Sequence, residues 1–402
     1  GARPTNPLED KDVIGIIETQ TEAPKKVIQH VSTPIYNRLN WIRGYQTNEK
    51  QDAQRIKFKF LNPKISKIAN LVPETINFNK IPNRSIDDWL FWSEGSVSVG
   101  KVGDTTNSSS KDVNTNAVTL GWDRKIDDET IHGYTVTYTQ DDVEVGSSGT
   151  SVDIDSYSFS TYATFNRSEN QYIEGILGVS KLDFKNIRKS GSNTLTGNRI
   201  GKQVFGSIQY INSVNGDKID ISPNIRLDLS STSLSQYSET GTNALYYGKQ
   251  TVETVGLYSG LTFNNELLKN DFILRPSAGF ELGIDLSPSS DVNLNYVSDP
   301  NTKYTKSIDQ HGEKSIKGKI GFDVLHNNGL SLMTFYERNQ SENSHSDTLY
   351  FLTGYVSSKE EEYSMALNDN TASIEYKRNV NGFDISFDTG YDLFAENSVT
   401  KK

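Results

Sequence analysis

Residues 272–286 read Phe-Ile-Leu-Arg-Pro-Ser-Ala-Gly-Phe-Glu-Leu-Gly-Ile-Asp-Leu, and this stretch decides the fold. Its even-numbered positions are all apolar or small, whereas Arg275, Glu281 and Asp285 occupy odd-numbered ones. A period of two is typical of a β-strand with one apolar and one polar face. Soluble strands usually have about 5 to 6 residues, and strands that cross a bilayer need about 9 to 11. The length and pattern of this stretch therefore predict a membrane-spanning β-strand.

The same alternation extends from Trp89 to the end of the chain, and the predicted connections alternate between short and long. A closed outer-membrane barrel sorts its loops in this way, with tight turns on one rim and longer loops on the other. Within one short connection, Asn215-Gly216 predicts a type I′ turn. The short connections are 125–129, 166–170, 214–217, 264–270 and 326–329, and the long ones are 103–114, 140–151, 183–198, 232–248 and 287–313.

Composition limits the function classes. The chain has 402 residues, a formal charge of −10 and no cysteine. An acidic balance argues against nucleic acid as a partner, since nucleic-acid binding needs a basic face. The absence of cysteine excludes thiolate catalysis and favours export through an oxidising compartment. No segment reaches the roughly 20 apolar residues of a membrane helix. No signal peptide is recognisable, which predicts a mature fragment or the C-terminal part of a longer precursor.

Residues 1–88 follow a different pattern from residues 89–402. Residues 24–45 have apolar side chains at helical spacing, and residues 10–21 are a weaker candidate helix. Pro34 leaves open a single helix, a kinked one or two short ones. Residues 55–61 alternate like a strand, and residues 62–86 form a polar connector. One face of the predicted helix is basic and carries Lys25, Lys26, Arg38 and Arg43.

Several segments resemble strands of the autotransporter (type V secretion) β-domain. The resemblance begins with Trp89-Leu-Phe-Trp-Ser-Glu-Gly-Ser-Val-Ser-Val-Gly100 and includes Leu120-Gly-Trp-Asp-Arg124 and Tyr172-Ile-Glu-Gly-Ile-Leu-Gly178. It implies an all-β, closed antiparallel transmembrane β-barrel of about twelve strands in the outer membrane of a Gram-negative bacterium. It also implies an N-terminal helix inside the lumen, joined to a secreted passenger. Residues 157–162, 197–201, 222–228 and 237–241 carry the rest of the resemblance.

The resemblance implies domains and partners as well. Residues 1–88 would be a linker and pore helix that follows the passenger, and residues 89–402 the barrel. The expected partners are outer-membrane lipid and lipopolysaccharide, the barrel-assembly machinery and the protein's own passenger. The C-terminus departs from the family pattern, because the chain ends at Lys402 without a terminal aromatic residue. Either a last strand is missing, or the barrel has up to sixteen strands.

A pore helix would bring its basic face against acidic side chains of the lumen. An alternative stays open, in which basic residues of the wall such as Arg226, Arg275 and Lys319 pair with those acids instead. The residues predicted to face the lumen are Glu94, Asp123, Glu174, Arg226, Asp228, Arg275 and Glu281.

The sequence predicts no catalytic site, cofactor or metal. None of its five histidines has the spacing of a metal motif, and none is placed clearly beside a serine on a lipid-facing strand. We therefore expect a translocator that exports and anchors a passenger and is plugged by its own helix. The alternative is a porin-like channel or loop-mediated adhesin barrel without a secreted passenger.

Overall fold

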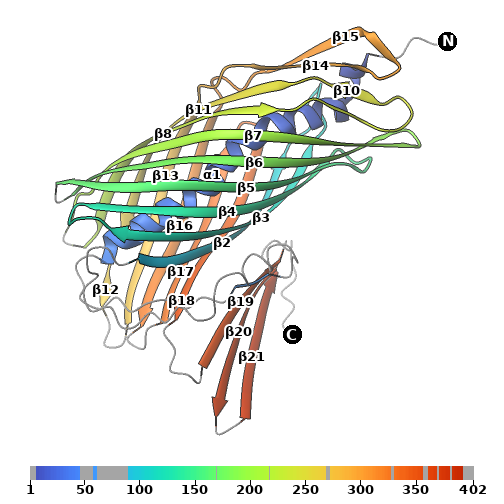
Figure 1. Ribbon diagram of the computed structural model, residues 1–402. Coiled ribbons are helices and arrows are strands. Elements are labelled where there is room, and N and C mark those ends of the chain that lie inside the picture. Colours follow the sequence, from blue (N-terminus) through green and yellow to red (C-terminus); the bar gives the residue numbers. More distant parts are fainter. Residues whose placement is uncertain are drawn as a thin grey trace.

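The computed structural model describes residues 6–45, 58–60, 89–168, 170–216, 218–268, 272–326, 330–355, 361–368, 371–380 and 383–392. The predicted connector at 62–86 and the last residues of the chain lie outside this set. Within it, a 3₁₀ turn at Pro7–Glu9 and one long helix, α1 (Lys11–Tyr45), precede a chain that is otherwise built from strands (Figure 1).

The largest sheet is a closed ring of antiparallel strands. Each strand pairs with its neighbours in order, and β18 returns to pair with β2, with Leu349 opposite Val97. The short β12 (Leu267–Leu268) pairs only with β13. The prediction of a closed barrel with about twelve strands is confirmed, and the ring closes without any strand beyond β18. Its twelve strands are β2 (Trp89–Val102), β3 (Lys111–Lys125), β4 (Thr130–Val145), β5 (Thr150–Ser168), β6 (Gln171–Ser190), β7 (Asn193–Asn212), β8 (Asp220–Leu234), β11 (Gln250–Asn264), β13 (Phe272–Asp285), β16 (Lys314–His326), β17 (Leu330–Ser341) and β18 (Ser344–Tyr355).

Apolar side chains lie on the outside of this ring and polar ones inside it. In β13, Phe280 and Leu282 are exposed, whereas Arg275 and Asp285 are buried. This is the reverse of a soluble fold, because an exposed apolar band of this size needs a hydrocarbon environment. The alternation in residues 272–286 therefore specifies which face of the strand meets lipid.

The connections lie on two rims of the barrel. We call the rim at the N-terminal end of α1 the distal rim and the opposite one the proximal rim. The distal rim carries residues 103–110, 146–149, 191–192, 235–249, 286–313 and 342–343, and the described parts of the proximal connections are 126–129, 170, 213–216, 218–219 and 265–268.

Two predicted long loops were wrong, because most of residues 140–151 and 183–198 continue the strands. At 190–193 the hairpin turns tightly through Gly191, whose φ of 59° places it at the first central position favoured by glycine in a type II′ turn. The predicted type I′ turn was also wrong, since neither Asn215 nor Gly216 has a positive φ.

Two smaller sheets accompany the ring. One has the order β15-β14-β10-β9 and belongs to the distal rim; its strands are β9 (Tyr237–Ser238), β10 (Leu245–Tyr247), β14 (Ser290–Tyr296) and β15 (Asp299–Ile308). The other has the order β1-β19-β20-β21 and contains β1 (Phe58–Phe60), β19 (Glu361–Asn368), β20 (Thr371–Val380) and β21 (Phe383–Asp392). The ring of paired strands thus ends at Tyr355, before the end of the predicted barrel region 89–402.

Helix α1 lies inside the ring along its length (Figure 1). It is one continuous helix of 35 residues, although Pro24 and Pro34 are inside it. An interior proline costs a helix about 3 kcal/mol or more, and enclosure offsets that cost, because burying each Val or Ile side chain contributes about 1.5–3 kcal/mol. Among the described residues, no helix is both long enough and apolar enough to span a bilayer.

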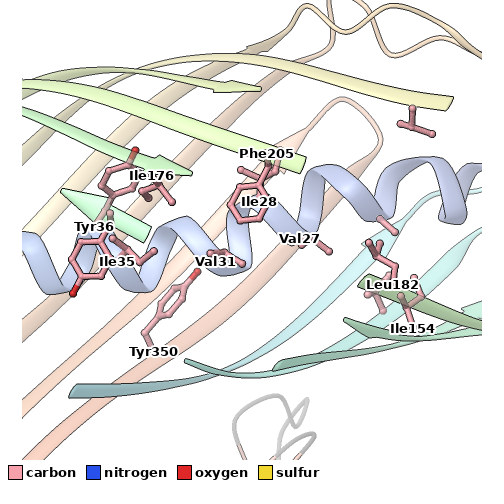
Figure 2. Close-up of a cluster of buried hydrophobic side chains, with 14 of the residues drawn as sticks. Val27, Ile28, Val31, Ile35, Tyr36, Ile154, Ile176, Leu182, Phe205 and Tyr350 are labelled. Carbon is pink, nitrogen blue, oxygen red and sulfur yellow. The ribbon is translucent and has the colours of Figure 1, made fainter. Parts of the chain in front are cut away.

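The inner wall departs from a purely polar lining where the helix contacts it. Val27, Val31 and Ile35 of α1 are at most 2 % exposed. They belong to one buried apolar cluster with wall residues that include Ile176 and Phe205 (Figure 2). The wall therefore carries an apolar patch that complements the apolar side of the helix.

Candidate functional site

The lumen, with α1 inside it, is the candidate functional site, and a buried ion pair joins the helix to the wall toward the proximal end. Arg38 Nε lies 2.9 Å from Asp123 Oδ2, and its Nη2 lies 3.2 Å from Oδ1. The Tyr162 hydroxyl donates to the same carboxylate at 2.8 Å, and Trp92 Nε1 donates to that hydroxyl at 2.8 Å. These side chains are almost entirely buried, and two-pronged contacts of this kind fix orientation as well as charge.

Two further contacts hold the C-terminal half of α1. Arg43 forms an ion pair with Glu174 of β6. Asn37 donates to Glu94 Oε1 at 2.9 Å and accepts a hydrogen bond from Lys319 of β16. The side-chain amide of Asn37 thus joins helix α1 to β2 through its nitrogen and to β16 through its oxygen.

The N-terminal half of the predicted basic face meets the wall differently. Lys25 Nζ lies 2.6 Å from Asp285 Oδ2, and that carboxylate is buried in β13. Lys26 lines a cavity beside the helix rather than appearing among the ion pairs of the described residues. Asp285 lies on the polar face of residues 272–286 but was not among the residues predicted to face the lumen.

The remaining predicted lumen residues pair mainly within the wall. Arg226 reaches Glu281 at 2.9 Å and Asp228 at 3.3 Å, and its guanidinium lies over the ring of Tyr258. Arg275 pairs with Glu266 near the proximal rim. The alternative in which wall bases neutralise wall acids therefore describes this side of the lumen, whereas Asp123 and Glu174 contact the helix.

Sequence reasoning missed a polar network in the N-terminal third of the helix. Gln20 accepts a hydrogen bond from Arg199 Nη1 at 2.6 Å and donates to Asn186 at 2.8 Å. Gln250 donates to Thr21 at 2.9 Å. The signal available in the sequence was weak: Arg199 lies on the polar face of its strand, but nothing in the pattern specifies a neutral glutamine as its partner.

The N-terminal end of α1 is fixed at the distal rim. Asp10 Oδ1 accepts the backbone N–H of Asp12 at 2.9 Å, as a helix N-cap residue does. The Asp12 carboxylate accepts hydrogen bonds from the hydroxyls of Ser109 at 2.6 Å and Thr150 at 2.8 Å. Lys11 pairs with Asp104 at 3.0 Å. The start of the helix is thus bonded to two hairpins of the rim.

A sheet at the distal rim packs on the same end of the helix. Val13 and Ile17 form a buried cluster with Tyr247, Val292 and Leu294 of this sheet. Burial raises the pKa of the Tyr247 hydroxyl well above its usual range, so this residue stays neutral and contributes through packing. The sheet covers the point where the helix leaves the lumen.

Replacing Ile17 with alanine is expected to loosen this cover. Truncating a buried isoleucine costs about 2–5 kcal/mol, and the apolar contact with β10 and β14 depends on it. We expect trypsin to cleave faster at Lys303 and Lys306 in β15, measured on the detergent-solubilised protein. Ile126→Ala, in an exposed proximal turn, is the matched control. Equal cleavage rates in the two variants would show that the sheet does not depend on the helix.

The helix is off-centre, and space remains along one side of it. A cavity of about 590 Å³ lies between α1 and the wall of β2 and β16–β18 and is lined by Lys26, His30 and Tyr350. A second, of about 130 Å³, lies nearer the proximal rim beside Asn37 and Lys319. Thr33, Lys317 and Glu337 line both cavities, so these polar residues lie where the two cavities adjoin.

The described residues contain no group of three or more His, Cys, Asp or Glu side chains arranged to hold a metal ion. One histidine lies where the sequence did not clearly place it. His132 is on the outward face of β4, and its Nε2 lies 2.8 Å from Thr161 Oγ1.

Comparisons with known proteins agree with this geometry. The translocator domain of the autotransporter NalP from Neisseria meningitidis superposes with a TM-score of 0.54 at 16 % identity, covering 68 % of this chain and 90 % of that one. The β-domain of the Bordetella autotransporter BrkA gives 0.49 at 15 % identity, covering 66 % and 98 %. At such identities the likeness concerns the fold. A search of curated protein sequences found no match.

The sequence itself matches a family model, described as the autotransporter beta-domain, over residues 91–337. The match starts within β2, ends within β17 and spans more than half of the chain. The chain therefore belongs to the autotransporter β-domain family.

Proposed function

We propose that this outer-membrane translocator exports a passenger joined to the N-terminal end of α1, anchors it at the cell surface, and then keeps α1 in the lumen as a plug. One observation carries the proposal: α1 runs through the ring with its N-terminal end bonded to the distal hairpins. If the proximal turns face the periplasm, as in outer-membrane barrels generally, the chain before α1 leaves on the outside.

The dimensions support this assignment. A helix with its side chains is about 10–12 Å wide. Barrels of about 8 strands are filled by their own side chains, and those of about 16 leave an aqueous channel. A ring of twelve lies between these cases, and here one helix occupies most of the interior. The same width admits an extended segment during export.

The charged residues of the lumen support a helix that docks in the lumen only after export. Asp123 and Glu174 would be hydrated in an unplugged pore and become buried when Arg38 and Arg43 dock. A buried ion pair gives modest net stability but penalises a misplaced partner strongly. These contacts therefore favour one depth and one rotation of the helix, which supports its role as the final resting segment.

The alternative of an open channel or loop adhesin without a passenger has less support, because α1 runs through the lumen and occupies most of it. Lipopolysaccharide and the barrel-assembly machinery remain predicted partners.

The proposal is tested by placing an epitope-tagged passenger before α1 and expressing the chain in Gram-negative cells. We expect the tag at the surface, accessible to protease on intact cells, while residues 11–45 stay protected. Deleting residues 344–355 removes β18 and should abolish both closure and surface display, because the ring then has two unpaired edges. A passenger that stays in the periplasm although the barrel is folded, as judged by heat-modifiable gel mobility, would contradict the proposal.

A further inference from the structure

A shallow groove of about 520 Å³ crosses the outer wall of the barrel from β4 to β8, on the face that meets lipid. Its floor consists of the small residues Ala163, Gly175 and Gly206 on three adjacent strands, with Ala163 directly opposite Gly175. Leu177 and Ile208 stand beside the floor and are 67 % and 52 % exposed. The depth of the groove thus comes from missing side chains in an otherwise bulky apolar wall.

Packing inside the protein does not explain the glycine at the centre of this floor. A Cβ atom added at Gly175 would meet nothing within 4 Å. At the inward-facing Gly178, by contrast, the same atom would lie 2.3 Å from the ring of Phe205. A side chain at position 175 would therefore project into the groove and fill it.

The end of the groove at β4 is polar and basic. His132 is bonded to Thr161 there, and Arg124 of β3 lies directly opposite His132 in the register. Arg124 shares the outward face of its strand with the exposed Trp122, since Asp123 between them points inward. His132 is the third residue of β4, close to the proximal rim. With the proximal rim toward the periplasm, as the proposed function has it, this end lies at the membrane–water interface on the periplasmic side.

The opposite end is apolar and farther from that rim. Leu227 is the eighth residue of β8, and it continues the row of paired residues that runs from His132 through Ala163, Gly175 and Ile208. Four inter-strand spacings give the groove a length of about 19 Å. Half of a hydrocarbon core is about 15 Å thick, so a groove that rises obliquely matches the depth of one leaflet.

We propose that this groove binds one acyl chain of a phospholipid from the periplasmic leaflet, with the phosphate at Arg124 and His132. A basic, hydrogen-bonding end at the interface and an apolar end in the hydrocarbon reproduce the polarity of a single phospholipid. A second copy of the barrel fits less well, because two convex walls that each carry a groove would enclose a void between them.

The test compares two outward-facing glycines in the full-length protein, extracted from outer membranes in mild detergent. Gly175→Phe fills the groove. Gly318→Phe is the matched control, because its added Cβ also meets nothing within 4 Å and it lies on β16, away from the groove. Retained phospholipid is counted by native mass spectrometry. We expect about a tenfold loss for Gly175→Phe, equivalent to about 1.4 kcal/mol or the contact of about two methylene groups, and no loss for the control.

A second arm tests the basic end. With Arg124→Gln, the protein should retain lipid but lose a preference for phosphatidylglycerol over phosphatidylethanolamine in vesicles of the two lipids. Equal lipid retention in the two glycine variants would overturn the proposal. So would loss of a chemically cross-linked dimer in Gly175→Phe with lipid retention unchanged, since the groove would then be an interface between copies. If Gly175→Phe fails to show heat-modifiable mobility, Ala163→Leu takes its place.

Discussion

Arg38→Met is expected to open the lumen. The substitution removes the guanidinium that pairs with the buried Asp123 carboxylate, while the Tyr162 hydroxyl continues to donate to that carboxylate. Removing one partner of a buried ion pair typically costs about 3–5 kcal/mol, which changes the balance between docked and undocked helix by about two to four orders of magnitude. We expect larger and more frequent conductance steps in planar bilayers, together with protease cleavage within residues 11–45.

The matched control removes both charges of the ion pair, so that neither is left buried without the other. Arg38→Met combined with Asp123→Leu replaces the pair by apolar side chains of similar volume, which is often neutral for stability. The double variant should return to the closed, low-conductance state. If the single variant stays closed as well, the ion pair does not hold the helix, and the apolar cluster around Val31 and Ile35 is sufficient by itself.

Gly121→Ala is expected to have a large effect on folding although it adds only one carbon. The added Cβ would lie 2.1 Å from the Trp92 ring, which is fully buried against the bare backbone of Gly121. Overpacking a core usually costs about 1–3 kcal/mol and sometimes more. Here the displaced indole also donates the hydrogen bond that orients Tyr162 toward Asp123. We expect a lower temperature for the heat-modifiable mobility shift and a weaker hold on the helix.

Gly318→Ala isolates this effect, because its methyl group projects into open space on the outward face. It should leave the mobility shift unchanged. Trp92→Phe in the Gly121→Ala background makes room for the methyl group and should recover part of the loss. Indistinguishable melting of Gly121→Ala and Gly318→Ala would mean that the indole has another position available.

The sequence predicted the barrel because lipid imposes a simple rule on it. Each spanning strand must alternate, and residues 272–286 do so without interruption. The strand count was harder to predict, since closure depends on which strand pairs with β2, and several later segments of the chain alternate equally well. Residues 140–151 and 183–198 looked like loops because the outward faces of these strand ends are mostly polar, as at Asp142, Glu144 and Lys185, and their apolar residues face the lumen.

The lumen was only partly predictable for a related reason. A charged residue on the polar face of a strand is recognisable, but its partner is set by the rotation and depth of the helix. Arg38 and Asp123 could be placed on facing surfaces from their patterns, whereas their pairing could not. Ile176 beside Leu177 was a usable signal that passed unnoticed: two adjacent apolar residues put one on each face, which indicates an apolar body inside the barrel.

Closure through β18 and β2 joins the last strand of the ring to its first. This pairing sets the order in which the ring closes and the helix docks. A chain that has been delivered only as far as β17 has no pore, because β2 and β17 are still open edges with unsatisfied backbone groups. Residue 355 must therefore reach the membrane before residue 45 can come to rest inside the wall. Under the proposed function, export of the passenger has to wait until β18 has reached the membrane, so a chain truncated before this strand cannot export the passenger that it carries.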